Sequence, residues 1–275
     1  MREEQLSERR ACELVSMSRS QLNYVSRKQE EPALVRSILS IKDQHPYYGV
    51  PRVHAMLRRR GFAVNGKKIY RLMKALQLTV GRKVKKKKRY VSPSRKMPAA
   101  LGVGDVWAMD FVFERLANGT SVRCFTIIDT LSRQVPGIHV AESMSGFAVV
   151  DYLERLSETQ RMPKHFVLDN GSEFTNQPFF DWCAKHEISI HLIDPGKPVQ
   201  NAYIESFNGK FRTEFLCQRK YSSVSQMRSK LTEWITHYNE ERPHSSLDYL
   251  TPKEFADQEA RVLDPQKNLP VLKTG

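Results

Sequence analysis

Residues 107–113 read WAMDFVF, and residues 165–174 read HFVLDNGSEF. In each stretch an aspartate, Asp110 or Asp169, lies within or directly after a short apolar run that predicts a strand. A carboxylate buried in a strand costs free energy unless a partner neutralises its charge, and a metal ion is one such partner. Either aspartate alone could simply cap the backbone. Two of them, each on an apolar strand, favour a shared site where strand ends form a ligand crevice.

The segments on either side of these strands predict a mixed sheet with helices on both faces. A turn at Asn118-Gly119 is expected to join the first strand to the next. Further strands are expected at residues 122–128, 134–140 and 188–192, and helices at residues 145–158, 178–186 and 201–215. Residues 231–255 are expected to add a helix and a Pro-containing tail.

The predicted helix over residues 201–215 carries a third carboxylate, Glu205. At 100° per residue, one polar stripe contains Asn201, Glu205, Asn208 and Arg212. An adjoining apolar stripe, expected to pack on the sheet, contains Ile204, Phe207, Phe211 and Phe215. A solvated helix face would give the same pattern, so this helix alone does not decide the function.

Three carboxylates from different elements suit the chemistry of phosphodiesters. Cleavage and strand transfer require charge neutralisation at the attacking and leaving oxygens, which two divalent cations about 3.5–4 Å apart provide. Magnesium prefers oxygen ligands and keeps several waters, so a few carboxylates suffice. His165, His186 and His191 show no metal-ligand spacing, and Glu173 is interpreted as a supporting or surface residue.

The positive charge is confined to one block. The chain has 275 residues, enough for two domains, and a net charge of +14. Residues 51–100 hold 17 Lys and Arg and no Asp or Glu. Such a block indicates a polyanionic partner, above all nucleic acid.

Because there is no apolar membrane span, no secretory signal and no paired cysteine motif, we expect a cytoplasmic protein with reduced thiols and no membrane partner.

The basic block begins in a predicted helix-turn-helix. Helices are expected at residues 33–48, at 51–60, and from an N-cap at Asn65 to about residue 78. The residues expected to face DNA from the last helix are Lys67, Lys68, Arg71 and Lys74. A three-helix bundle with a solvated basic face is the alternative. Residues 81–98 predict a linker that follows the phosphate backbone through Lys85, Lys86, Lys87, Lys88 and Arg89.

Several motifs carry a family resemblance over roughly residues 33–256. They are W-x-x-D at 107–110, D-N-G-x-E-F at 169–174, N-A-x-x-E-S-F at 201–207, Y-N-x-x-R-P-H-S-S-L-x-Y-L-T-P at 238–252 and Y-Y-G-x-x-R at 47–52. Thirty-five residues separate Asp169 from Glu205. This pattern resembles the second-frame (OrfB-type) transposases of bacterial insertion sequences with two reading frames, whose catalytic core is similar to that of retroviral integrases.

The resemblance implies a ribonuclease-H-like α/β core preceded by an all-α helix-turn-helix domain. It implies that Asp110, Asp169 and Glu205 are the catalytic residues and hold two Mg²⁺ ions, with Mn²⁺ as a substitute. The implied reaction is cleavage of DNA at element ends and attack of a 3′-hydroxyl on a second strand. Arg212 is expected near a substrate phosphate, with Asn208 as a further DNA contact. The implied partners are double-stranded DNA, at least one further copy of the chain, and, as an additional candidate, the first-frame product.

The expected domains are an N-terminal helical segment (1–30), the helix-turn-helix (31–80), a basic linker (81–100), the catalytic core (101–220) and a C-terminal helix and tail (221–275). Residues 5–30 could be part of a helix-turn-helix or a frayed helical hairpin. Two alternative functions stay open: a non-catalytic DNA-binding relative or partial subunit of a frameshift fusion, and a nuclease acting on RNA–DNA hybrids. His244 could approach DNA, although a role in stabilising a turn is favoured.

Overall fold

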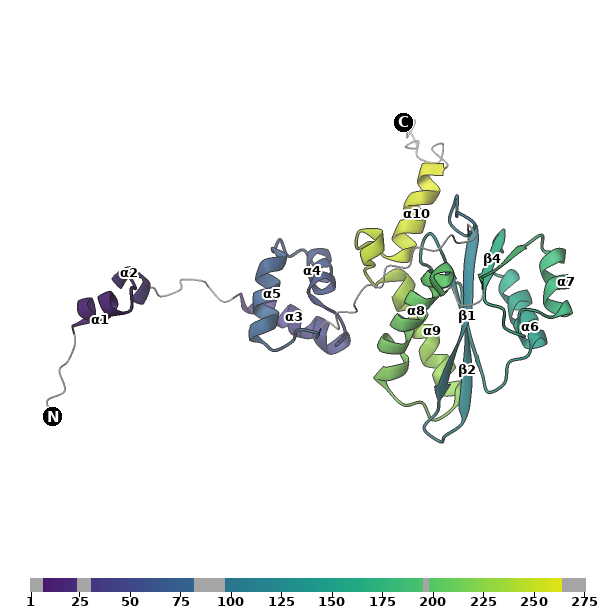
Figure 1. The fold of residues 1–275 in the computed structure, drawn as a ribbon, viewed down its shortest axis with the longest axis horizontal. Helices are drawn as coiled ribbons and strands as arrows, with labels where there is room; N and C mark the ends of the chain where they lie inside the picture. Colours follow the sequence, from purple (N-terminus) through teal and green to yellow (C-terminus); the bar gives the residue numbers. More distant parts are fainter. Residues whose placement is uncertain (1–6, 24–30, 82–96, 195–197, 264–275) are drawn as a thin grey trace, which may run out of the picture.

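The computed structural model describes residues 7–23, 31–81, 97–194 and 198–263. A five-stranded sheet with strand order β3-β2-β1-β4-β5 forms the centre of the C-terminal domain (Figure 1). The strands are β1 (Val106–Arg115), β2 (Ser121–Asp129), β3 (Ile138–Ala141), β4 (His165–Leu168) and β5 (Ser189–Leu192). The first three pair antiparallel, while β4 pairs parallel with both β1 and β5. The predicted mixed sheet is confirmed.

The register of the sheet brings the two aspartates to the same level. Parallel pairing aligns Ala108 of β1 with Val167 of β4. Two residues further along each strand, the same register places Asp169 beside Asp110. The two lie on the same face of the sheet, because side chains alternate with a period of two.

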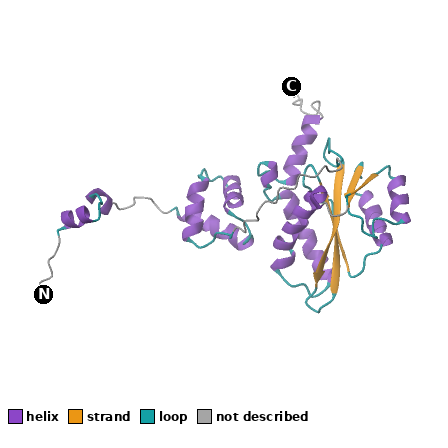
Figure 2. Cartoon of the chain, in the orientation of Figure 1, coloured by secondary structure: helices purple, strands orange, loops and turns teal. Residues whose placement is uncertain are grey.

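Helices cover both faces of the sheet (Figure 2). One face packs on α8 (Ala202–Glu214) and α9 (Val224–Glu240), through a core that includes Val112, Ile204 and Phe207. The other face packs on α6 (Gly146–Ser157) and α7 (Gln177–Lys185), through a core that includes Phe125 and Phe166. Because Asp110 and Ala108 share a face, both aspartates are on the side of α8.

The N-terminal helices have a separate core. Helices α3 (Pro32–Gln44), α4 (Val50–Arg59) and α5 (Gly66–Ala75) enclose Leu34, Leu57 and Ile69, all fully buried. As predicted, Asn65 caps α5: its side-chain oxygen accepts from the Lys67 amide at 2.8 Å. The predicted all-α domain ahead of an α/β domain is confirmed. Two short helices, α1 (Glu8–Leu14) and α2 (Arg19–Leu22), precede it, and a capping box formed by Ser18 begins the second.

Three predicted segments differ from the structure at their ends. The predicted strand at 134–140 shortens to β3 because Val135 donates its amide to the side chain of Asn239 instead of to a strand. The helix expected within residues 33–48, with its end near His45-Pro46, ends at Gln44, as predicted. The helix expected at 201–215 is preceded by a 3₁₀ turn, η1 (Pro198–Asn201). The helix expected with a Pro-containing tail at 231–255 begins earlier, as α9, and the tail contains a 3₁₀ turn, η3 (Ser245–Leu247), and the start of α10 (Pro252–Leu263).

A further 3₁₀ turn, η2 (Leu216–Gln218), follows α8. Among the helices that the structure describes, none combines the length and apolar character required to cross a membrane.

Candidate active site

Asp110 is a half-buried carboxylate in the middle of β1. Its Oδ1 accepts from the Phe111 amide at 2.7 Å, and its Oδ2 accepts from the Asn208 side-chain amide at 2.8 Å. Burial raises the pKa of Asp110, and the charges of Asp169 and Glu205 raise it further, against these two hydrogen bonds. The three predicted carboxylates therefore act on one another electrostatically, although they come from three separate elements.

Asp169 follows directly after β4, in a tight turn. Its Oδ1 accepts from the Gly171 amide at 3.0 Å, and the Asn170 side chain donates to the Ile193 carbonyl at 2.9 Å. A Cβ at Gly171 would lie 3.0 Å from Asp169 Oδ1, so a larger residue there would press on the carboxylate. The sequence D-N-G thus fixes Asp169 at the carboxyl end of β4.

Glu205 lies in the first turn of α8 and is exposed. This position favours a carboxylate, because the amino end of a helix carries partial positive charge. The start of the helix is tied to β1 by Asn201, whose side chain donates to the Met109 carbonyl at 3.4 Å. Glu205 is therefore held next to the strand that carries Asp110.

Asn208 is buried, which differs from its expected place on a DNA-facing stripe. Only 6% of its surface is exposed. Its Oδ1 accepts from the Thr126 hydroxyl at 3.0 Å, which directs its NH₂ group toward Asp110. Thr126 lies opposite Asp110 in the β1–β2 register and is fully buried. Sequence reasoning missed Thr126; a hydroxyl in the apolar run of β2 opposite an aspartate was the available signal.

The donor set fits hard divalent cations, since all three candidate ligands are carboxylates. In the described parts of the chain, no three or more His, Cys, Asp or Glu side chains, these carboxylates included, are arranged so that they could hold a metal ion. Asp110 nevertheless combines partial burial with two neighbouring negative charges, an arrangement that a bound cation would relieve.

The basic residues predicted to face DNA occupy different environments. On α5, Lys67, Arg71 and Lys74 are exposed. Lys68 lies on the same helix but forms an ion pair of 2.6 Å with Glu31. Arg212 on α8 is exposed and donates to the Phe113 carbonyl at 3.3 Å. Residues 85–89, which contain Lys85 to Lys88 and Arg89, lie outside the described residues.

The remaining polar candidates have structural partners. His244 is 2% exposed, and its Nε2 lies 2.9 Å from the Tyr238 hydroxyl, so it stabilises a turn and does not face DNA. Glu173 pairs with Arg123. His165 contacts His191 at 3.1 Å, and His186 contacts Glu154 at 3.1 Å. The four cysteines are free thiols, as expected.

Comparison with known proteins agrees with this architecture. Two models of the family described as Integrase core domain match residues 101–198 and 186–252, and a model described as HTH-like domain matches residues 28–88. A solved simian T-cell lymphotropic virus intasome, in complex with the PP2A regulatory subunit B56 gamma, contains a chain with the same fold (TM-score 0.50, 15% identity). The match covers 86% of this chain and 76% of that one.

Relatives from insertion elements are closer in sequence. A 39.2 kDa protein of insertion element IS476 of Xanthomonas euvesicatoria is 41% identical over 252 residues, 91% of this chain and 72% of the relative. A 31.7 kDa protein of IS407 of Burkholderia multivorans is 38% identical, over 94% of each chain. The transposase of IS904 of Lactococcus lactis is 26% identical over 82% of this chain and 94% of the relative.

A ribonuclease-H-like sheet with an acidic centre, behind a helix-turn-helix domain, defines the integrase class of DNA-recombining enzymes. Within that class, the chain belongs to the OrfB-type transposases of bacterial insertion sequences.

Proposed function

We propose that this transposase cuts and joins DNA at the ends of its insertion sequence, with Asp110, Asp169 and Glu205 as its catalytic, metal-holding carboxylates. The observation that carries the proposal is the environment of Asp110. Its carboxylate is half buried, yet it faces the charges of Asp169 and Glu205. Such mutual repulsion is costly in a purely structural cluster and useful in a cation site.

Two Mg²⁺ ions, or Mn²⁺ in their place, would be held by these three carboxylates. Bound there, they would activate the attacking oxygen and neutralise charge on the leaving oxygen. The chain's own residues keep the carboxylates in position: the Phe111 amide and Asn208 hold Asp110, and the Gly171 amide holds Asp169.

In the proposed reaction, water first attacks a phosphodiester at the element end and leaves a 3′-hydroxyl. That hydroxyl then attacks a phosphodiester of target DNA, so that one P–O bond forms as another breaks. Arg212, exposed on the same helix as Glu205, would contact a substrate phosphate. The exposed cations of α5, Lys67, Arg71 and Lys74, would bind the element end in the major groove.

The proposed division of labour follows the chain. Residues 31–80 would recognise DNA, residues 81–100 would follow its backbone, and residues 101–220 would catalyse, with flanking segments at 1–30 and 221–275. Joining two ends requires at least two copies on DNA. The first-frame product is a further candidate partner, because IS-type transposases of this class can be assembled from two reading frames.

The test is cleavage and joining of a labelled duplex that carries the element end, in Mg²⁺, in Mn²⁺ and in chelator. We expect metal-dependent products from the wild type. Asp110→Asn, Asp169→Asn and Glu205→Gln should each bind the duplex as tightly as the wild type and lower the cleavage rate by about 10³-fold or more, the scale of losing a main electrostatic group in catalysis.

Glu240→Gln is the matched control, since it removes one negative charge from an exposed residue of α9. It should cut at the wild-type rate. Metal-dependent cleavage retained in any of the three carboxylate variants would refute the assignment. Binding without products in either metal would instead favour a non-catalytic relative or a partial subunit.

A further inference from the structure

Two sequence motifs that the catalytic proposal does not use come together in the folded chain. The motif Y-Y-G-x-x-R ends at Arg52 in the first turns of α4. The motif R-P-H-S-S-L-x-Y-L-T-P begins at Arg242 and extends to Pro252, the first residue of α10. Arg52 and Arg242, one from each motif, both pair with Glu214, so that one carboxylate links the two motifs.

The first contact is an ion-pair network on Glu214, at the last turn of α8. Arg242 donates to both carboxylate oxygens of Glu214 at 2.6 Å, and it is fully buried. Arg52 of α4 reaches the same carboxylate at 3.2 Å. Glu214 thus holds one arginine from its own domain and one from the helix-turn-helix domain.

The second contact is at the other end of α4. Arg59 donates to both oxygens of Glu254 in α10, at 2.8 and 2.5 Å, and to the Tyr249 carbonyl at 3.2 Å. Arg52 and Arg59 are seven residues apart, so they lie within about 20° of one another on a single face of α4. That whole face is directed at the catalytic domain.

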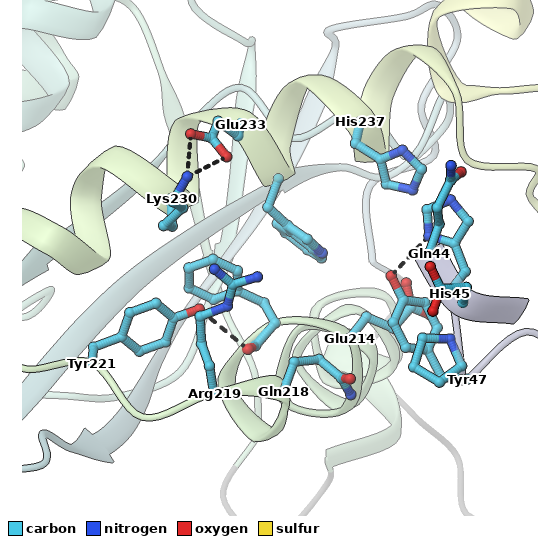
Figure 3. Close-up of a pocket in the computed structure, with 14 residues that line it drawn as sticks. Gln44, His45, Tyr47, Glu214, Gln218, Arg219, Tyr221, Lys230, Glu233 and His237 are labelled. Atoms are coloured by element: carbon cyan, nitrogen blue, oxygen red, sulfur yellow. Dashed lines mark hydrogen bonds and ion pairs between the residues drawn. The ribbon is translucent and has the colours of Figure 1, made fainter. Parts of the chain in front are cut away.

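Aromatic contacts reinforce the junction. The Tyr48 hydroxyl lies 3.2 Å from His237 Nε2 on α9. The ring of His45 stacks on that of His237, at 4.6 Å between centroids, and on that of Tyr48, at 4.5 Å. Figure 3 shows His45 and Tyr47 beside Glu214 and His237, on one side of a pocket of about 430 Å³ between the domains. Defined polar and aromatic contacts therefore hold the two domains together, although the pocket leaves part of the junction unfilled.

Helix α8 connects this junction to the catalytic centre. Glu205 lies in its first turn and Glu214 in its last. Nine residues of α-helix separate the two along the axis by about 13.5 Å. Helix α5, with its exposed cations, lies on the side of the helix-turn-helix core away from the catalytic domain (Figure 1). The element that would bind DNA is thus linked to the carboxylates through rigid helices.

We propose that Arg52, Arg59, Glu214, Arg242, Tyr249 and Glu254 form an interdomain clamp that fixes the distance between α5 and the carboxylates, and thereby determines which phosphodiester is cut. The clamp residues position the DNA; they do not take part in the chemistry. This inference rests on the proposed function, because it assumes that α5 binds the element end and that the core cuts it.

The test exploits the exposed half of the clamp, where substitutions are tolerated better than at buried Arg242. Arg59→Glu and Glu254→Arg each break the ion pair, and the double variant restores it with the charges exchanged. We expect the wild type to cut a labelled end duplex at one main phosphodiester. Each single variant should spread cleavage over neighbouring phosphodiesters and lower the main product about tenfold or more, as misplacement of a substrate by about 1 Å can do. The double variant should restore the main product to within about twofold.

Two controls distinguish misplacement of the DNA from a change in the protein's charge. Arg58→Glu makes the same charge change as Arg59→Glu on the neighbouring, exposed residue and should cut at the wild-type bond. Glu254→Arg adds positive charge, so its loss of precision cannot come from weaker attraction to DNA. The clamp is overturned if both single variants cut the wild-type bond with wild-type precision, or if the double variant is no better than the singles.

Failure of the proposed function has a different signature: the wild type itself would show no metal-dependent cleavage. Calorimetry then decides on the clamp directly. A single unfolding transition in the wild type and the double variant, split into two in each single variant, supports it. Identical profiles in all four proteins overturn it.

Discussion

Asp110 keeps two hydrogen-bond donors on its carboxylate, and one of them, Asn208, is itself oriented by Thr126. The Thr126 hydroxyl lies 3.0 Å from the amide oxygen of Asn208 and 2.9 Å from the Asp110 carbonyl, while the NH₂ group of Asn208 donates to the Asp110 carboxylate. At the residue scale, three connected side chains, Asp110 of β1, Thr126 of β2 and Asn208 of α8, form this part of the site. Their contacts fix the orientation of the Asp110 carboxylate.

The contacts between Thr126, Asn208 and Asp110 predict that variants of Asn208 and Thr126 bind metal more weakly even without DNA. Asn208→Leu and Thr126→Val should each weaken Mn²⁺ binding about 10- to 100-fold, the usual effect of losing a partner that orients a ligand. Titration calorimetry of the DNA-free protein measures it. Ser206→Ala, on the exposed side of α8, is the control. Wild-type affinity in Asn208→Leu would show that Asp110 needs no such support.

The sequence predicted the three carboxylates but not how they are supported. Helical periodicity placed Asn201, Glu205, Asn208 and Arg212 on one stripe. It could not tell which edge of the stripe faces the sheet, since that depends on how α8 rotates as its aromatic residues pack. Asn201 and Asn208 face inward, while Glu205 and Arg212 stay exposed.

At the scale of elements, the sequence predicted the helix caps and turns that depend only on neighbouring residues. Asn65 caps α5, and Gly119 at the β1–β2 turn has φ +88°, which favours glycine. Predictions failed at ends that depend on distant partners. The strand expected from residue 134 begins at Ile138, because Asn239, far away in sequence, binds the backbone of Val135 through both its amide oxygen and its NH₂ group.

Helix α5 supports a prediction of its own, because its four cations are not equivalent. Lys67→Ala, Arg71→Ala and Lys74→Ala should each lower the affinity for DNA and reduce the slope of log affinity against log salt by about 1. Lys68→Ala should change the slope less, because Glu31 already pairs with Lys68. Binding measured by fluorescence anisotropy at several salt concentrations tests this. Equal losses at all four positions would contradict it.

At the scale of the whole molecule, the order of domains could be predicted and their contact could not. Composition separated a basic helical region from an acidic-centred α/β region. The clamp, however, pairs Arg59 with Glu254 across 195 positions, and each of these residues on its own resembles an ordinary surface charge. Only the fold reveals that these two residues meet.

Three imidazoles in different parts of the molecule, His244 buried and His45 and His139 half-buried, predict how the protein responds to acid. Burial is the main cause that lowers the pKa of His45 and of His139 to about 4 and that of His244 to about 2. The unfolded chain, with histidine pKa values near 6.5, binds more protons below that pH than the folded chain does. Stability should therefore be intact above pH 6.5 and fall as the pH is lowered toward 4, by up to about 1.4 kcal/mol per pH unit for each histidine.

Urea unfolding at pH 7.5, 6, 5 and 4.5 measures this loss. His139→Phe keeps a ring against Tyr152 but cannot be protonated, so its stability should depend less steeply on pH. A wild-type stability that does not change over this range would contradict the prediction.

The placement of Glu205 and Glu214 on one helix also constrains how the gene can change length. Inserting a single codon between them would turn one carboxylate by about 100° relative to the other and move it about 1.5 Å along the axis. Either the catalytic centre or the clamp would then lose its partner. The exposed turn at Asn118 and Gly119, at the end of the β1–β2 hairpin, meets no such demand and should accept extra residues. We expect natural length variants of this protein to differ at the hairpin turn and to share one helix length between the two glutamates.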